Sequence, residues 1–60
     1  MKRRDLVKEL TDAGFWQPQG ERKGTKHDKF TDGEVTVMVP RHSEIKETTA
    51  KSILKRAGLR

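Results

Sequence analysis

A short segment near the middle of the chain combines residue types that could act on a phosphodiester group. It reads Lys23-Gly24-Thr25-Lys26-His27-Asp28-Lys29-Phe30. Histidine is the side-chain type that gives or takes a proton near neutral pH, so His27 is the candidate for general acid–base chemistry. The neighbouring residues would supply positive charge for a phosphate and a backbone that turns closely beside it: Lys23, Gly24, Thr25, Lys26 and Lys29.

Strand alternation would place these side chains on two faces. If Phe30 points into a core, His27 and Lys29 point to the opposite, solvent-exposed face. Asp28 then lies on the Phe30 side, where an ion pair with Lys26 or with an arginine is favoured over a catalytic role. On these residues alone, an incidental surface histidine in a charged strand remains the alternative reading of His27.

The second histidine, His42, lies in the sequence Val39-Pro40-Arg41-His42-Ser43. The favoured interpretation is a turn residue whose ring hydrogen-bonds the loop before the second helix. An auxiliary catalytic role for His42 and Arg41 is the alternative. No Ser-His-Asp spacing and no pair of neighbouring carboxylates indicates another kind of active site.

The composition restricts the classes of ligand. The chain has 14 Lys and Arg against 9 Asp and Glu and a net charge of +5, which favours phosphate backbones or anionic membranes as partners. Its longest apolar run, Val37-Met38-Val39, is too short to span a membrane. No apolar segment follows the basic residues 1–4, as it would in a signal peptide. The absence of cysteine excludes disulfides, cysteine zinc sites and thiol nucleophiles. We therefore expect a cytoplasmic protein that binds nucleic acid, with no metal and no cofactor.

Hydrophobic spacing predicts one helix near each end of the chain, over residues 2–13 and 47–57. Gly14 and Gly58 follow these segments as typical C-terminal stops. The apolar stripes would consist of Leu6, Val7, Leu10 and Ala13 in the first helix and of Ala50, Ile53, Leu54 and Ala57 in the second.

Three strands are predicted between the helices. Phe15 and Trp16 open a short extended stretch that Pro18 restricts to a sheet edge. Residues 26–31 form the second strand and residues 34–39 the third, with Asp32-Gly33 at the centre of the hairpin between them. The three aromatic side chains are expected in the core, because a core this small needs them, and base stacking on them is the minority view.

The predicted order is thus α-β-β-β-α, in a single domain over residues 1–60. A three-stranded antiparallel sheet would carry two helices on one face and leave the other face in water. This α+β architecture is that of a double-stranded-RNA-binding domain, although a fold alone does not establish a function.

Several blocks of the sequence resemble one known family in their order and spacing. They are Asp12-Ala13-Gly14-Phe15, Arg22-Lys23-Gly24-Thr25-Lys26-His27, Val37-Met38-Val39-Pro40-Arg41-His42, Glu44-Ile45-Lys46 and Ser52-Ile53-Leu54-Lys55-Arg56-Ala57-Gly58-Leu59. Over nearly its whole length the chain resembles the HicA (YcfA-like) toxins of bacterial type II toxin–antitoxin systems. Two positions depart from the family pattern: Asp28 stands where the family often has an apolar residue, and Thr25 replaces the commoner serine.

The resemblance implies a fold like that of a double-stranded-RNA-binding domain and mRNA cleavage that does not need the ribosome. It also implies neutralisation by a HicB antitoxin that covers the active site. The catalytic histidine of the toxin family falls on His27 in this sequence. His27 would act as general base on the ribose 2′-OH or as general acid on the leaving 5′-oxygen, without a metal. His42 or water would supply the second proton transfer.

Two other functions remain open from the sequence. The first is a non-catalytic module that coats duplex RNA through its basic face. The second is a small DNA-binding protein, which is disfavoured because no helix-turn-helix spacing links two adjacent helices. For the toxin, we expect a monomer when it is alone and an oligomeric assembly with its antitoxin.

Overall fold

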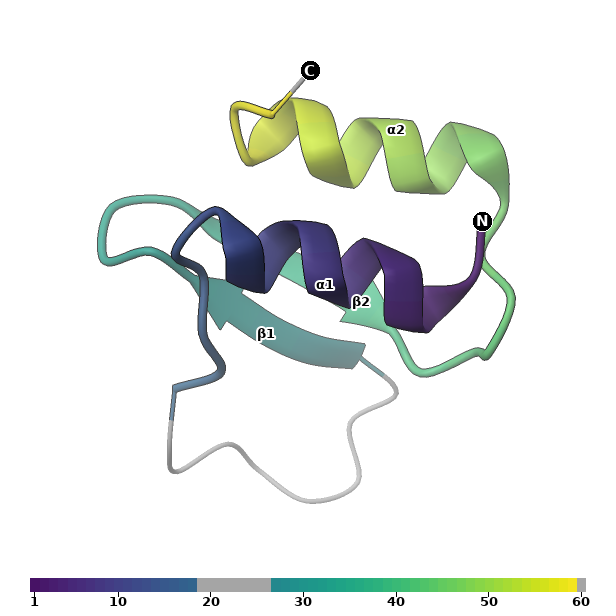
Figure 1. The fold of residues 1–60 in the computed structure, drawn as a ribbon, viewed down its shortest axis with the longest axis horizontal. Coiled ribbons are helices and arrows are strands. Elements are labelled where there is room, and N and C mark those ends of the chain that lie inside the picture. Colours follow the sequence, from purple (N-terminus) through teal and green to yellow (C-terminus); the bar gives the residue numbers. More distant parts are fainter. Residues whose placement is uncertain (19–26, 60) are drawn as a thin grey trace.

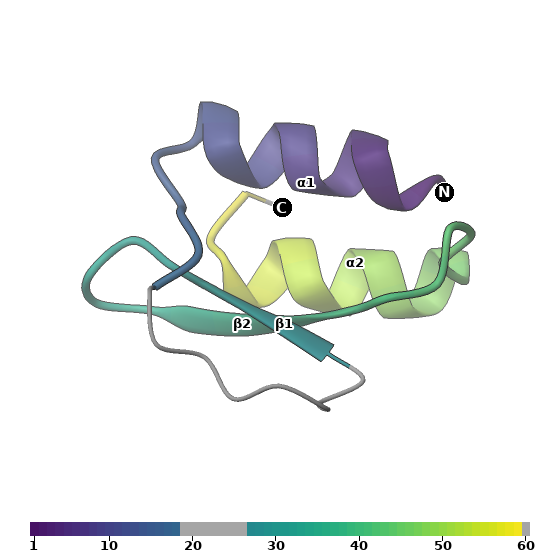
Figure 2. The same cartoon turned by 90° about the horizontal axis from the view of Figure 1, so that it is seen from below.

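The computed structural model describes residues 1–18 and 27–59. Four elements follow one another in this part of the chain: α1 (Arg3–Asp12), β1 (His27–Thr31), β2 (Thr36–Pro40) and α2 (Glu47–Arg56). The two helices run in the same direction and lie on one side of the antiparallel pair of strands (Figures 1 and 2). The prediction of an α+β fold with both helices on one face of the sheet is therefore confirmed.

Both helices form where the hydrophobic spacing predicts them. Leu6 and Leu10 are completely buried on α1, as is Leu54 on α2. Gly14 and Gly58 follow the helices with φ of +95° and +81°, a backbone conformation that glycine adopts without steric cost. The first predicted apolar stripe differs from the observed burial only at Ala13, which caps α1 and is exposed.

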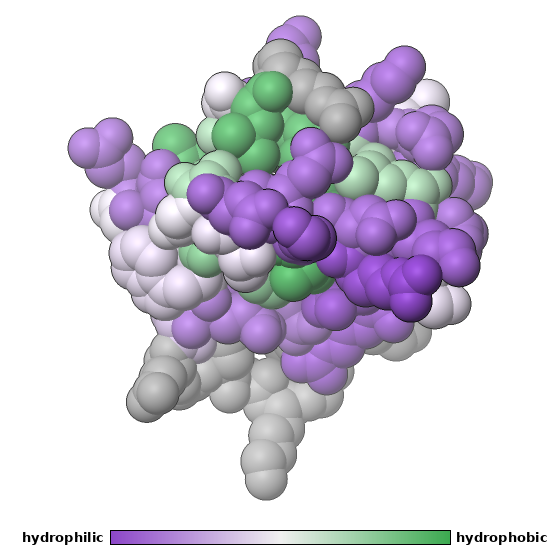
Figure 3. Space-filling view, viewed as in Figure 1, coloured by the Kyte–Doolittle hydropathy of each residue, from purple (hydrophilic) through white to green (hydrophobic). Residues whose placement is uncertain are grey.

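The face of the sheet that packs against the helices forms the other side of the hydrophobic core. Phe30 of β1 pairs with Val37 of β2, and both side chains are buried together with Val39. Alternation sends Met38 to the opposite face, where it is 45% exposed. Hydrophilic side chains cover most of the face seen in Figure 3, and hydrophobic ones appear there in small areas. The apolar side chains are thus concentrated between the sheet and the helices.

The connection between the strands is longer than the two-residue turn predicted at Asp32-Gly33. Thr31 pairs with Thr36, so the connection runs from Asp32 to Val35. The Asp32 carboxylate explains the difference, since its Oδ1 accepts hydrogen bonds from the backbone N–H groups of Glu34 at 2.9 Å and Val35 at 2.7 Å. A side chain thereby satisfies donors that a tighter hairpin would have paired with the other strand.

Replacing Asp32 with asparagine should make the free energy of unfolding less dependent on pH in the acid range. Hydrogen bonds from the N–H groups of Val35 and Glu34 lower the pKa of the Asp32 carboxyl from its ordinary value of 3.8. Because the folded pKa is the lower one, the charged carboxylate stabilises the fold above pH 3.8. This contribution disappears as the pH falls through the lowered pKa. Urea unfolding at neutral and acid pH should show the stability difference between parent and Asp32→Asn shrinking on acidification. A difference that stays constant would contradict the prediction.

The prediction of three strands is wrong for the part of the chain that the structure describes, where two strands form. Of the first predicted strand, one bridge is present, in which Trp16 and Thr31 exchange backbone hydrogen bonds of 2.8 and 2.9 Å. The next hydrogen-bonded pair of an antiparallel ladder would join Pro18 to Lys29. Because proline has no N–H, Pro18 cannot donate to Lys29, and the ladder does not continue there as a strand.

Trp16 also departs from the expectation that all three aromatic side chains are in the core. Phe15 and Phe30 are buried, with 4% and 3% of their surface exposed, but Trp16 is 50% exposed. The bridge accounts for this, because Trp16 lies directly opposite Thr31, whose side chain points away from Phe30 and the helices. Extended backbone therefore turns Phe15 into the core and Trp16 out of it.

Candidate active site around His27

His27 is the first residue of β1 and pairs with Pro40 on β2. Its side chain is exposed, in agreement with the predicted alternation. Lys29 lies two residues further along the strand and shares this outer face, where it is half-buried. The other residues predicted to surround His27 lie outside the described residues: Lys23, Gly24, Thr25 and Lys26.

Asp28 is held by two arginines, which confirms the ion pair expected at this position. Arg3 donates from Nη2 to Asp28 Oδ2, and the Asp28 side chain is only 14% exposed. Arg41 donates from Nε to Asp28 Oδ1 at 2.8 Å, and its Nη2 forms an ion pair with the same oxygen at 2.8 Å. Such charge-assisted hydrogen bonds are stronger than those between neutral groups. A carboxylate on the inner side of a strand is thus compensated by two positive charges.

This cluster of Arg3, Asp28 and Arg41 ties together three parts of the molecule. Arg3 belongs to the first turn of α1, Asp28 to β1, and Arg41 to the segment after β2. Arg3 also donates from Nε to the carbonyl oxygen of Pro40 at 3.0 Å. His27 pairs with Pro40 and precedes Asp28, so these contacts fix both neighbours of His27 in the sheet. The sequence did not identify Arg3 as the partner of Asp28. The only signal for this role was its position outside the apolar stripe of the helix.

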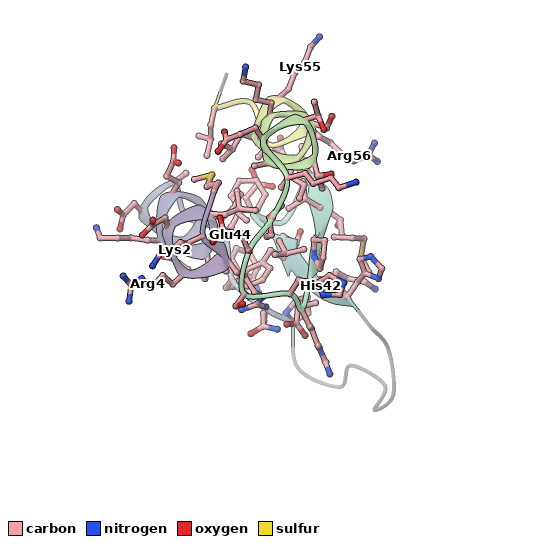
Figure 4. The ribbon with its side chains drawn as sticks, turned by 90° about the vertical axis from the view of Figure 1, so that its right-hand side faces the viewer. Lys2, Arg4, His42, Glu44, Lys55 and Arg56 are labelled. Atoms are coloured by element: carbon pink, nitrogen blue, oxygen red, sulfur yellow. The ribbon has the colours of Figure 1, made fainter. Side chains whose placement is uncertain are left out.

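Arg41 and His42, the predicted auxiliary residues, differ in their surroundings. The Arg41 guanidinium is engaged by Asp28, with 49% of the side chain exposed. His42 is exposed on the loop between β2 and α2 (Figure 4). It lines a shallow hollow of about 320 Å³ with residues that include Glu44, Ile45 and Thr49. Within residues 1–18 and 27–59 its ring makes no hydrogen bond, so the predicted bond to this loop is wrong.

The labelled basic side chains of the helices point in different directions. Lys2 and Arg4 extend from the start of α1, whereas Lys55 and Arg56 extend from α2 on another side of the molecule (Figure 4). Arg56 also donates from Nε to the Thr36 carbonyl oxygen at 3.1 Å, which fastens the end of α2 to the start of β2. The four labelled basic side chains of the helices therefore do not gather into a single patch.

In the part of the chain that the structure describes, no three His, Cys, Asp or Glu side chains gather in a way that could hold a metal ion. None of the helices in this part has the length and apolar character needed to cross a membrane.

Known proteins resemble this chain in both sequence and structure. The family model for the HicA toxin of bacterial toxin-antitoxin systems matches residues 3–59. A chain in a solved toxin-antitoxin complex from Streptococcus pneumoniae is 32% identical, with a TM-score of 0.78 over 98% of each chain. No curated protein matches the sequence. Because the family model covers nearly all of the chain, and a solved relative shares its fold, this chain belongs to the HicA family of bacterial toxins.

Proposed function

We propose that this toxin is an endoribonuclease that cleaves mRNA without the ribosome and uses His27 as its general acid or base. The observation that carries the proposal is the placement of His27, exposed on the open face of the sheet beside Lys29. Membership of the HicA family supports it, because His27 occupies the position that the resemblance implies to be catalytic. Lys23, Lys26 and Lys29, with Gly24 and Thr25, are proposed to bind the RNA backbone.

The reaction that suits a single exposed histidine is an internal transesterification of RNA. His27 accepts the proton of the ribose 2′-OH, and the 2′-oxygen forms a bond to phosphorus. The bond between phosphorus and the 5′-oxygen breaks, and the leaving oxygen receives a proton from His42 or from water. Lysines offset the negative charge that develops on the phosphoryl oxygens. This route requires the 2′-OH and therefore acts on RNA and not on DNA, and it is proposed to need no metal.

Purified toxin should cut single-stranded RNA in the presence of EDTA and leave a 2′,3′-cyclic phosphate on the upstream product. The cyclic end follows from attack by the 2′-oxygen, and the matching DNA strand should stay intact because it lacks that oxygen. Electrophoresis with analysis of the new ends would measure both. Activity abolished by EDTA and restored by magnesium would exclude the metal-free route. Tight binding of duplex RNA with no new ends would instead support the alternative, a non-catalytic double-stranded-RNA-binding module.

The proposed protein partner is a HicB-type antitoxin that covers His27 and part of the surrounding basic surface. Support comes from the related chain, which belongs to a toxin-antitoxin complex, and from the net charge of +5, which an acidic surface would complement. The toxin is proposed to be cytoplasmic and monomeric when alone, and to form an oligomeric assembly with the antitoxin. Co-expression of the neighbouring reading frame should relieve toxicity, and continued growth arrest would count against this pairing.

A further inference from the structure

Trp16 is a large aromatic side chain that the fold holds in an exposed position. Its backbone is fixed by the two hydrogen bonds to Thr31. Its ring lies against the hairpin loop, since a Cβ added at Gly33 would meet Trp16 Cη2 at 3.6 Å. The other half of the side chain remains open to solvent. Trp16 therefore presents an aromatic surface in a fixed orientation. Its exposed half does not contribute to the small hydrophobic core.

The same face of the sheet carries the candidate catalytic residue. Thr31 lies opposite Trp16, and alternation along β1 places Lys29 and then His27 on the face shared by these two residues. Met38 of β2, opposite Lys29, adds an exposed apolar side chain to this face. Thr31 lies four positions after His27 in the strand, a distance of about 13 Å at the usual rise per residue. A few nucleotides of extended RNA cover this distance.

We propose that Trp16 is a base-binding residue, on which an unpaired base of the RNA stacks while the phosphate of a nearby nucleotide lies at His27. This inference rests on the proposed function. The face combines an aromatic surface with Lys29 on a chain of net charge +5, which is the combination that binds single strands: stacking for the bases and positive charge for the backbone. Every base has an aromatic face, so this contact selects unpaired RNA and not a particular sequence.

The chain contains one tryptophan, so its fluorescence reports on this position alone. The probe is a short single-stranded oligoadenylate with 2′-O-methyl groups, which binds but cannot undergo attack by the 2′-oxygen. Stacking should quench the fluorescence of Trp16 on titration with this probe. The same sequence paired with its complement should quench far less, because its bases are already stacked on one another. Equal fluorescence in the free and the saturated protein would overturn the proposal.

Three substitutions separate stacking from general apolar contact. Trp16→Phe keeps an aromatic face, whereas Trp16→Leu and Trp16→Ala remove it. Binding of a dye-labelled form of the probe, measured by anisotropy, should weaken about tenfold to a hundredfold in the leucine and alanine variants and much less in the phenylalanine variant. Leu59→Ala is the matched control, because Leu59 is also an exposed apolar residue, 37% exposed, but follows α2. It should bind like the parent. Circular dichroism should show that all four variants remain folded.

Three outcomes test this inference separately from the proposed function. If the parent cleaves natural RNA but the leucine and alanine variants bind the probe as tightly as it does, base stacking is wrong and the nuclease proposal stands. If those variants lose affinity only for the co-expressed antitoxin, Trp16 is a protein contact and the proposal is again overturned. Quenching by the probe together with no cleavage of natural RNA would support the base site and contradict the nuclease.

Discussion

Replacing His27 with alanine should slow RNA cleavage by about 10²- to 10⁴-fold, the usual contribution of general acid–base catalysis by one side chain. The fold should survive, because the His27 side chain is exposed at the start of β1 and lies outside the hydrophobic core. Cleavage of a labelled RNA by the two purified proteins at equal concentration measures the effect. In cells, induction of the variant should permit growth and leave mRNA intact, whereas the parent should do neither.

His42→Ala is the companion experiment, because it removes the other exposed histidine, the candidate for the second proton transfer. A loss as large as that of His27→Ala would assign the second proton transfer to His42. A small loss would assign that transfer to water. The His27 assignment is wrong if His27→Ala, shown to be folded by circular dichroism, cleaves RNA at the parent rate.

Replacing Asp28 with alanine should lower the free energy of unfolding by about 1–3 kcal/mol, the cost of leaving charged hydrogen-bonding groups without their partner. The Asp28 side chain is 14% exposed and the Arg3 side chain 26%, so water compensates the loss only in part. Because small domains are stable by only about 5 kcal/mol, a loss of this size is a large share of the total. It should be visible in urea unfolding at neutral pH.

The control is Asp12→Ala, which also removes an ion pair. Lys8 and Asp12 lie one helical turn apart on α1, and their side chains are 75% and 66% exposed. Exposed pairs of this kind contribute about 0.3–0.5 kcal/mol. A loss from Asp28→Ala no greater than that from Asp12→Ala would contradict the structural role of the Arg3, Asp28 and Arg41 cluster.

Periodicity was a reliable guide to the helices. Their apolar stripes repeat at helical spacing, and a glycine with positive φ follows each one, so the signals for α1 and α2 are contained in a few neighbouring residues. Alternation was equally reliable for β1 and β2. It correctly placed Phe30 in the core and His27 on the opposite face.

The errors occurred where a side chain competes with the backbone or where the backbone lacks a donor. The Asp32 carboxylate accepts two backbone N–H groups and lengthens the connection between the strands, which the turn signal at Asp32-Gly33 does not reveal. Pro18 reduces the first predicted strand to the bridge at Trp16. The sequence indicates that Pro18 restricts the strand to a sheet edge. Whether Pro18 also ends the strand depends on which residue of the neighbouring strand lies opposite it.

The sequence alone determined the two helices, the alternation that exposes His27, and a resemblance to the HicA family that the comparisons confirm. These features depend on residues close together in the chain or on motif order. Only the tertiary structure decided that Asp28 is held by Arg3, which is 25 residues away, and by Arg41, which is 13 residues away. It also decided that Trp16 lies outside the core. Such contacts depend on how helix and sheet pack against each other, and local periodicity carries no information about which distant residue a side chain will meet.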